Sequence, residues 1–324
     1  QIGEIYRYHT ELSKKEAREA GIEMLRQVGI PAPEKRYDQF PHELSGGMKQ
    51  RVLTSMAMAL KPRLLIADEP TTALDVTIQA QILSLLSDLC RREGTALVMI
   101  THDLGVVRSI ADRVYVMYCG KIMEQGTCGE ILDSPAHPYT KGLIRAIPTL
   151  GERMKRFHQI PGNVPSPAAK PDGCYFSNRC DICDAKCHEK MPPLRDIQIK
   201  MLEDCGMSET IVRTHDLCVD FRIKSRAFGK PDILSAVRNV SLEIRRGETF
   251  GLVGESGCGK STLAGSLVHF VPMTGGTIEM NGVTLDKNSG KSDWKSARKG
   301  VQMIFQDPFG SLNPRFQVWQ LIAE

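Results

Sequence analysis

A glycine-rich segment constrains the fold of this chain more than any other feature: Gly254-Glu255-Ser256-Gly257-Cys258-Gly259-Lys260-Ser261-Thr262. It fits the pattern G-x-x-x-x-G-K-[ST] of a phosphate-binding loop. The apolar residues 249–253 before it predict a buried strand, and residues 263–270 after it predict a helix. Strand, loop and helix in this order are the context that such a loop requires, so the segment predicts an α/β fold.

The residues of the loop suit the chemistry of phosphate binding. Small residues let backbone N–H groups curl around phosphates at the start of a helix. Lys260 supplies a positive charge, and the Ser261 hydroxyl can ligate Mg²⁺. The alternative is a plain glycine-rich turn, which would not explain why motif and context agree. The segment therefore predicts that the chain binds a nucleoside triphosphate.

Composition narrows the class of protein. A length of 324 residues is enough for about two domains. The net charge of +4 is too small to indicate nucleic-acid binding. No apolar run approaches the ~18 residues that would predict a membrane span. The chain has no initial Met and stops within a pattern at its other end, so we expect an internal fragment of a longer protein.

A second segment, in the first third of the chain, also suits an anion. Ser45 is placed to cap a helix predicted over residues 48–60, and the amides of Gly46 and Gly47 would form its anion-facing start. By itself, Ser-Gly-Gly before a helix is equally consistent with an ordinary cap. Its meaning depends on the segments that follow.

Two carboxylates and a histidine follow at the ends of two predicted strands. Asp68 and Glu69 end an apolar strand that begins at residue 63, and His102 follows a strand over residues 96–100. At such strand ends the first carboxylate can hold Mg²⁺ through water, and the second can polarise an attacking water. His102 alone would be more typical of a structural residue, but its place in this order indicates a sensor of the γ-phosphate.

The order of these segments resembles the ATP-binding cassette (ABC) ATPases. The similar motifs are the signature at residues 44–51, Walker B at 64–70, the D-loop with Asp75, the histidine switch at 99–103, Walker A at Gly254–Thr262, and the Q-loop with Gln306. The resemblance covers nearly the whole chain. It implies an enzyme that hydrolyses ATP to ADP and phosphate.

The resemblance also implies a role for each matching residue. Glu69, His102, Lys260 and Gln306 would be catalytic, and Mg²⁺ would be held by Ser261, Gln306 and Asp68. Nucleotide contacts are implied for Gly254, Glu255, Ser256, Gly257, Cys258, Gly259, Lys260, Ser261, Thr262, Ser45, Gly46, Gly47 and Asp75. For adenine stacking, an aromatic residue upstream of Walker A is needed, and we select Phe228 before Phe221.

The motif order differs from that of a single cassette, in which Walker A and the Q-loop come first. The chain therefore resembles the middle of a fused two-cassette protein. Residues 1–150 would be the C-terminal half of one cassette, residues 151–210 a Pro- and Cys-rich linker domain, and residues 211–324 the N-terminal half of a second cassette. The implied fold class is α/β, with P-loop NTPase cassette halves built from a mixed sheet, flanking helices and a helical subdomain.

In the family, each ATP lies between the Walker A of one cassette and the signature of the other. A second cassette or a second chain would then complete the ATP sites of this chain. A competing hypothesis is that the two halves fold together as one circularly permuted cassette, since exposed loop tips tolerate such cuts.

A proline-rich string at residues 135–148 indicates the subfamily. Physically, it would dock a helix on the cassette, but it also resembles the extension of the oligopeptide, dipeptide and nickel importer ATPases. This resemblance implies a peripheral subunit at the cytoplasmic face of the inner membrane that powers the import of peptides or related solutes. Its partners would be transmembrane permease subunits and, indirectly, an extracytoplasmic solute-binding protein. The substrate stays open among peptides, glutathione and nickel.

Two other functions compete with this one. A non-transport ABC ATPase could act on nucleic acid or ribosomes, but the mild charge and the lack of basic–aromatic stretches argue against a nucleic-acid partner. A nucleotide-binding fragment without turnover is the other alternative, because each half-cassette is incomplete.

A cysteine-rich segment suits a structural metal. In the resembled importers, a quartet comparable to Cys174, Cys180, Cys187 and Cys205 holds a [4Fe–4S] cluster. Zn²⁺ would accept the same four sulfurs. Cys183 could replace one of them, and reduced, unligated cysteines are the remaining alternative.

Overall fold

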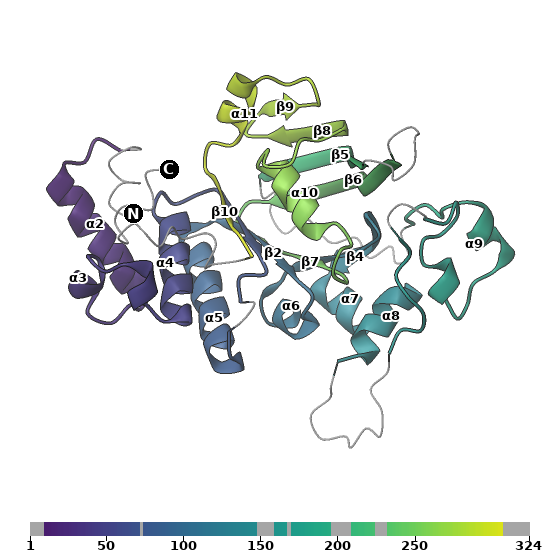
Figure 1. Ribbon diagram of the computed structural model, residues 1–324, viewed down its shortest axis with the longest axis horizontal. Helices are drawn as coiled ribbons and strands as arrows, with labels where there is room; N and C mark the ends of the chain where they lie inside the picture. Colours follow the sequence, from purple (N-terminus) through teal and green to yellow (C-terminus); the bar gives the residue numbers. More distant parts are fainter. Residues whose placement is uncertain are drawn as a thin grey trace, which may run out of the picture. The chain divides into compact units, whose positions relative to one another are not determined.

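The computed structural model describes residues 10–71, 74–147, 159–166, 170–195, 209–223 and 232–306. The chain divides into two units (Figure 1), one formed by Gln1–Met99 with Gly300–Glu324 and the other by Ile100–Lys299. These units do not follow the three segments predicted from the motifs, because the first unit takes residues from both ends of the chain. The division by motif stays a prediction.

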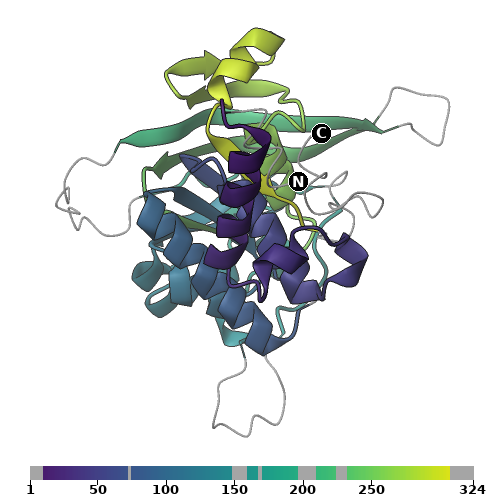
Figure 2. The same cartoon turned by 90° about the vertical axis from the view of Figure 1, so that its left-hand side faces the viewer.

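The described residues of the first unit form four α-helices and a short 3-10 helix. They are α2 (Lys14–Gln27), α3 (Pro33–Arg36), η1 (Pro41–Glu43), α4 (Gly46–Met58) and α5 (Val76–Glu93). Helix α2 contacts α3 and α4, and α4 contacts α5 (Figure 2). Local chemistry sets the helix ends: Ser13 and Glu16 form a capping box at the start of α2, and left-handed Gly94 ends α5.

Parallel strands place two distant parts of the chain beside each other in this unit. The strands are β1 (Leu64–Asp68), β2 (Ala96–Thr101) and β10 (Val301–Ile304), in the order β10-β1-β2. Strand β1 pairs with β10 from Leu64↔Val301 to Ala67↔Ile304. Every residue of β1 and β2 is buried, as expected for strands covered on both faces.

The second unit contains a mixed three-stranded arrangement. Strand β3 (Arg113–Tyr118) pairs in parallel with β7 (Thr249–Val253) and antiparallel with β4 (Lys121–Thr127). The same unit contains the helices α6 (Leu104–Ile110), α7 (Cys128–Asp133) and α8 (Pro138–Arg145). The mixed sheet with flanking helices confirms the predicted α/β class.

An antiparallel sheet with the order β6-β5-β8-β9 completes this unit. Its strands are β5 (Thr210–Ile223), β6 (Asp232–Arg245), β8 (Gly275–Met280) and β9 (Val283–Leu285). Helix α10 (Lys260–Leu267) contacts β5 and β6, and α11 (Lys291–Ala297) contacts β9 (Figure 1). The sheet thus supports the helix that follows the glycine-rich loop.

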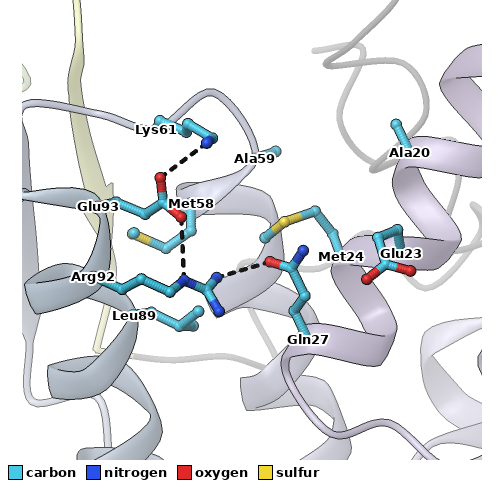
Figure 3. Close-up of a pocket in the computed structure, with 10 residues that line it drawn as sticks. All are labelled: Ala20, Glu23, Met24, Gln27, Met58, Ala59, Lys61, Leu89, Arg92 and Glu93. Carbon is cyan, nitrogen blue, oxygen red and sulfur yellow. Dashed lines mark hydrogen bonds and ion pairs between the residues drawn. The ribbon is translucent and has the colours of Figure 1, made fainter.

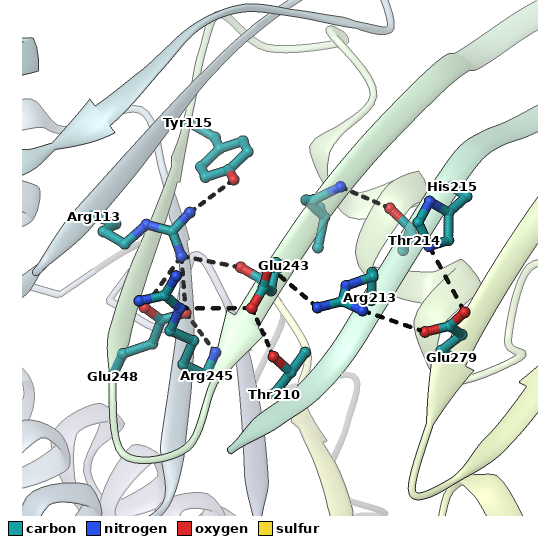
Figure 4. Close-up of polar contacts among 11 residues, drawn as sticks. Arg113, Tyr115, Thr210, Arg213, Thr214, His215, Glu243, Arg245, Glu248 and Glu279 are labelled. Atoms are coloured by element: carbon teal, nitrogen blue, oxygen red, sulfur yellow. Dashed lines mark hydrogen bonds and ion pairs between the residues drawn. The ribbon is translucent and has the colours of Figure 1, made fainter. Parts of the chain in front are cut away.

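Charged side chains join β3 to the antiparallel sheet (Figure 4). The Arg113 guanidinium donates to the Glu243 carbonyl at 3.2 Å and lies 3.4 Å from the Glu248 carboxylate. The Glu243 carboxylate accepts a 2.6 Å hydrogen bond from the Thr210 hydroxyl, which lowers the pKa of Glu243. Burial raises the pKa of Glu248. The network thus ties β3 to β6 and to Glu248, the residue directly before β7.

Within the second unit, the described residues 170–195 pack against β3 and α8 through an aromatic cluster. This segment includes the short helices η2 (Ser177–Arg179) and α9 (Ala185–Glu189). Phe176 packs against Tyr118 and Tyr139, with ring centroids 5.5 and 5.4 Å apart. All three aromatic residues are buried. In the parts of the chain that the structure describes, no helix is long and apolar enough to cross a membrane.

Candidate phosphate-binding site and its companion motifs

The glycine-rich loop connects β7 to α10, as its sequence predicts. Gly254 and Gly259 both have positive φ, +154° and +105°. A Cβ on Gly254 would lie 2.1 Å from the Met117 carbonyl oxygen, and one on Gly259 would lie 2.3 Å from the Ala236 carbonyl oxygen. Close backbone approach therefore requires glycine at both positions, and it fixes the loop against β3 and β6.

The Lys260 ammonium is held inside the loop. Its Nζ donates to the carbonyl oxygens of Gly254 at 2.8 Å and Glu255 at 3.1 Å, and the residue is only 5% exposed. Ser256, Gly257 and Ser261 are exposed, whereas Cys258 is buried and burial raises its pKa. Half-buried Thr262 follows in α10. The loop thus presents its small residues and the Ser261 hydroxyl to solvent around a fixed positive charge.

Two residues outside the loop also hold it, and neither was selected from the sequence. The Tyr139 hydroxyl accepts a 2.9 Å hydrogen bond from the Glu255 amide, and Arg179 binds the Glu255 carboxylate at 2.9 Å. Tyr139 belongs to the proline-rich string, which the sequence singled out as a whole. Arg179 stands next to Cys180, and no spacing or periodicity in the sequence distinguished it from the other arginines of the chain.

His102 lies in the second unit, directly after β2. Its side chain is exposed, and the next residue, Asp103, caps helix α6 by accepting from the Gly105 amide at 2.8 Å. The predicted place of His102 at a strand end is therefore confirmed. Its role as a γ-phosphate sensor stays a prediction.

The two predicted carboxylates end β1 in the first unit. Asp68 is 4% exposed, and Glu69 has a φ of +45°, which is rare for a residue other than glycine. The Gln306 amide Nε2 donates to the Glu69 carboxylate at 3.1 Å. The parallel pairing of β1 with β10 brings these two side chains together, although they are far apart in the sequence. Such backbone strain is typical of functional sites.

The signature segment begins α4 in the same unit. Ser45 is the N-cap, and its hydroxyl accepts from the Met48 amide at 3.4 Å. A Cβ on Gly47 would lie 2.9 Å from Ile78 of α5. Asp75 caps α5 by accepting from the Ile78 amide at 2.9 Å. The ordinary cap function of Ser45 and Asp75 is thus observed, and contacts of Ser45, Gly46, Gly47 and Asp75 with a nucleotide stay predictions.

The two candidates for adenine stacking both precede β6 in the chain. Phe228, the preferred candidate, lies outside the described residues. Phe221, the second candidate, is 38% exposed on β5, where it pairs with Leu234.

The cysteine-rich segment does not assemble a metal site among the described residues. Cys174, Cys180, Cys183 and Cys187 are free thiols, and the Cys174 amide donates to the Cys187 carbonyl at 2.7 Å. No three of the described Cys, His, Asp or Glu side chains gather as metal ligands. Cys205 lies outside the described residues. The described cysteines alone therefore do not fit the predicted [4Fe–4S] cluster or Zn²⁺.

A pocket of about 180 Å³ lies in the first unit, away from these motifs (Figure 3). Residues of α2, α5, the end of α4 and the loop after it line the pocket, and they include an ion pair of 3.0 Å between Lys61 and Glu93. None of the residues selected for nucleotide or Mg²⁺ binding lines this pocket. It is therefore a separate feature of the helical part of the first unit.

Two protein-family models match the chain. The model described as "ABC transporter" matches residues 4–72 and 237–322. The model described as "Oligopeptide/dipeptide transporter, C-terminal region" matches residues 123–187. The segments matched by the first model contain Asp68, Glu69, Lys260 and Gln306. The segment matched by the second model contains Tyr139 and Arg179.

Relatives match over the full length of the chain. An oligopeptide transport ATP-binding protein, OppD, of Mycobacterium bovis is 38% identical, over 100% of this chain and 58% of its own length. A peptidoglycan transport ATP-binding protein, YejF, of Agrobacterium fabrum is 41% identical, with 50% of its length covered. A glutathione import ATP-binding protein, GsiA, of Escherichia coli is 40% identical, with 48% covered. The chain thus spans about half the length of these relatives.

Proposed function

This chain belongs to the ATP-binding cassette transporter family, and we propose that it binds and hydrolyses ATP to power the import of peptides or related small solutes. The observation that carries the proposal is the phosphate-binding loop, in which two obligatory glycines and a buried Lys260 form a fixed cationic cradle. The relatives named for oligopeptide, peptidoglycan and glutathione transport support an import role. They leave the substrate of this chain open.

The described residues supply the groups that phosphoryl transfer to water needs. Lys260 would neutralise charge on the phosphates of the ATP held by its own loop. Glu69 would orient and polarise the attacking water in the ATP site to which its strand end belongs. The hydrogen bond from Gln306 fixes the Glu69 carboxylate for this task. The Ser261 hydroxyl in the second unit, and the Asp68 carboxylate and Gln306 amide oxygen in the first unit, are each the kind of ligand that Mg²⁺ prefers. A bound Mg²⁺ ion would further neutralise the phosphates of its ATP. His102 would sense the γ-phosphate.

The family's mode of action supplies the partners of this proposal. Transmembrane permease subunits would receive the movement that ATP binding drives, at the cytoplasmic face of the membrane. A second cassette, or a second copy of the chain, would provide the opposite faces of the ATP sites. A permuted cassette is the alternative, and the pairing of β1 with β10 supports it because residues 64–67 and 301–304 come from different half-cassettes.

A structural [4Fe–4S] cluster or Zn²⁺ would need Cys205 in addition to the cysteines of residues 174–187. Metal analysis of protein purified without oxygen tests this part of the proposal separately. It plays no part in the ATPase chemistry described above.

ATP hydrolysis by the 324-residue chain tests the proposed function. We expect Lys260→Ala and Glu69→Gln each to reduce turnover by at least about 100-fold, because each removes a group that stabilises the transition state. Glu69→Gln should still bind ATP, whereas Lys260→Ala should not. Turnover that persists in both variants would contradict the assignment of these residues.

A further inference from the structure

The Glu255 carboxylate, the first side chain of the phosphate-binding loop, is held by an arginine from outside the cassette motifs. Arg179 donates to one Glu255 oxygen from Nη1 at 2.9 Å and to the other from Nη2 at 3.2 Å. The Arg179 side chain is 5% exposed and that of Glu255 is 24% exposed. Two parallel bonds of this kind fix both the charge and the orientation of a carboxylate.

Arg179 is itself fixed by the segment that follows the proline-rich string. Its Nε donates to the Pro161 carbonyl at 3.0 Å, and Nη1 also donates to the Tyr118 hydroxyl at 3.2 Å. The guanidinium lies 5.8 Å from the ring centres of Tyr118 and Phe176. Burial opposes its charge, but hydrogen bonds with Glu255 and Tyr118 raise the pKa of Arg179 above its ordinary value. The residue is therefore always a cation.

A second contact holds the backbone of the same loop residue. The Glu255 amide donates to the Tyr139 hydroxyl at 2.9 Å, and Tyr139 is fully buried. The start of α8 is fixed in turn, since His137 Nδ1 accepts from the Tyr139 amide and the Glu124 carboxylate accepts from the His137 amide. Side chain and backbone of Glu255 are thus both anchored to residues 123–187.

Glu255 lies where its charge matters to a triphosphate. Its carbonyl oxygen is 3.1 Å from Lys260 Nζ, so it belongs to the same cradle. An uncompensated carboxylate there would repel the phosphates and compete for Lys260. We propose that Arg179 is a positioning residue for the phosphate-binding loop, which neutralises Glu255 and holds its carboxylate away from Lys260 so that the loop can accept ATP. This inference rests on the proposed ATP-binding function.

The proposal is tested by the affinity for Mg–ATP, measured by calorimetry, and by the melting temperature of each variant. We expect Arg179→Gln to weaken ATP binding by about tenfold, since it leaves a carboxylate in the cradle. The double variant Arg179→Gln/Glu255→Gln should recover most of the affinity, because the repelling charge is gone. The control is Arg108→Ala, which removes an exposed ion pair with Asp133 in the same unit and should bind ATP normally.

Several outcomes would overturn the proposal. One is an unchanged affinity for Mg–ATP in Arg179→Gln. Another is a loss of affinity that the added Glu255→Gln substitution fails to restore in the double variant, since Arg179 would then have only a structural role. If Arg179→Gln does not fold, Arg179→Lys takes its place. We then expect a smaller loss of ATP affinity, because lysine keeps the positive charge but lacks the two parallel donors of the guanidinium. Unchanged affinity in that variant would also count against the proposal. Absence of ATP binding by the unmodified chain would instead contradict the proposed function.

Discussion

At the scale of single residues, the loop glycines show how backbone geometry decides function. Gly254 and Gly259 have positive φ and face carbonyl oxygens of Met117 and Ala236. Gly257 also has a positive φ, of +77°, but nothing lies within 4 Å of a Cβ placed there. The first two glycines therefore serve close packing and conformation together, and the third serves conformation alone.

This difference predicts unequal effects of two alanine substitutions. Gly259→Ala should destabilise the protein by about 2–3 kcal/mol and reduce ATP binding, because the new methyl group meets a backbone carbonyl in addition to adopting a positive φ. Gly257→Ala is the matched control and should cost only about 1 kcal/mol, the penalty of a left-handed residue. Urea unfolding followed by ATP titration measures both effects. Equal losses in the two variants would refute the packing argument.

At the scale of the elements, the start of α8 connects the proline-rich string to the loop. His137 Nδ1 accepts from the Tyr139 amide, which requires that this nitrogen carries no proton. Burial lowers the pKa of His137 from its ordinary value of 6.5. The folded protein therefore binds fewer protons at this residue than the unfolded chain does, and its contribution to stability is lost as the pH falls below 6.5.

The sign of this shift predicts how stability depends on pH. The free energy of unfolding should fall between pH 7.5 and 5.5, with His137 contributing at most about 1.4 kcal/mol per pH unit. His137→Asn should show a smaller fall, because asparagine also caps helices but does not titrate in this range. Urea denaturation at both pH values makes the comparison. An identical pH dependence in the two proteins would exclude His137 as the titrating group.

At the scale of the whole molecule, local signals predicted elements but not their long-range partners. Residues 249–253 form β7 as expected, and Ser45 caps α4. Helix α10 ends at Leu267 rather than at residue 270, because His269 adopts a positive φ of +59°. No local sequence pattern predicted the pairing of β1 with β10 or the ion pair between Arg179 and Glu255, because each joins residues far apart in the sequence.

The central claim is that residues 254–262 form a site for ATP, and direct binding of Mg–ATP tests it best. Calorimetry on the unmodified chain should show saturable binding, and Lys260→Ala should abolish it because the phosphates lose their fixed cation. Lys61→Ala, which removes an exposed lysine paired with Glu93, should bind as the unmodified chain does. No binding by the unmodified chain, or equal binding by Lys260→Ala, would contradict the account.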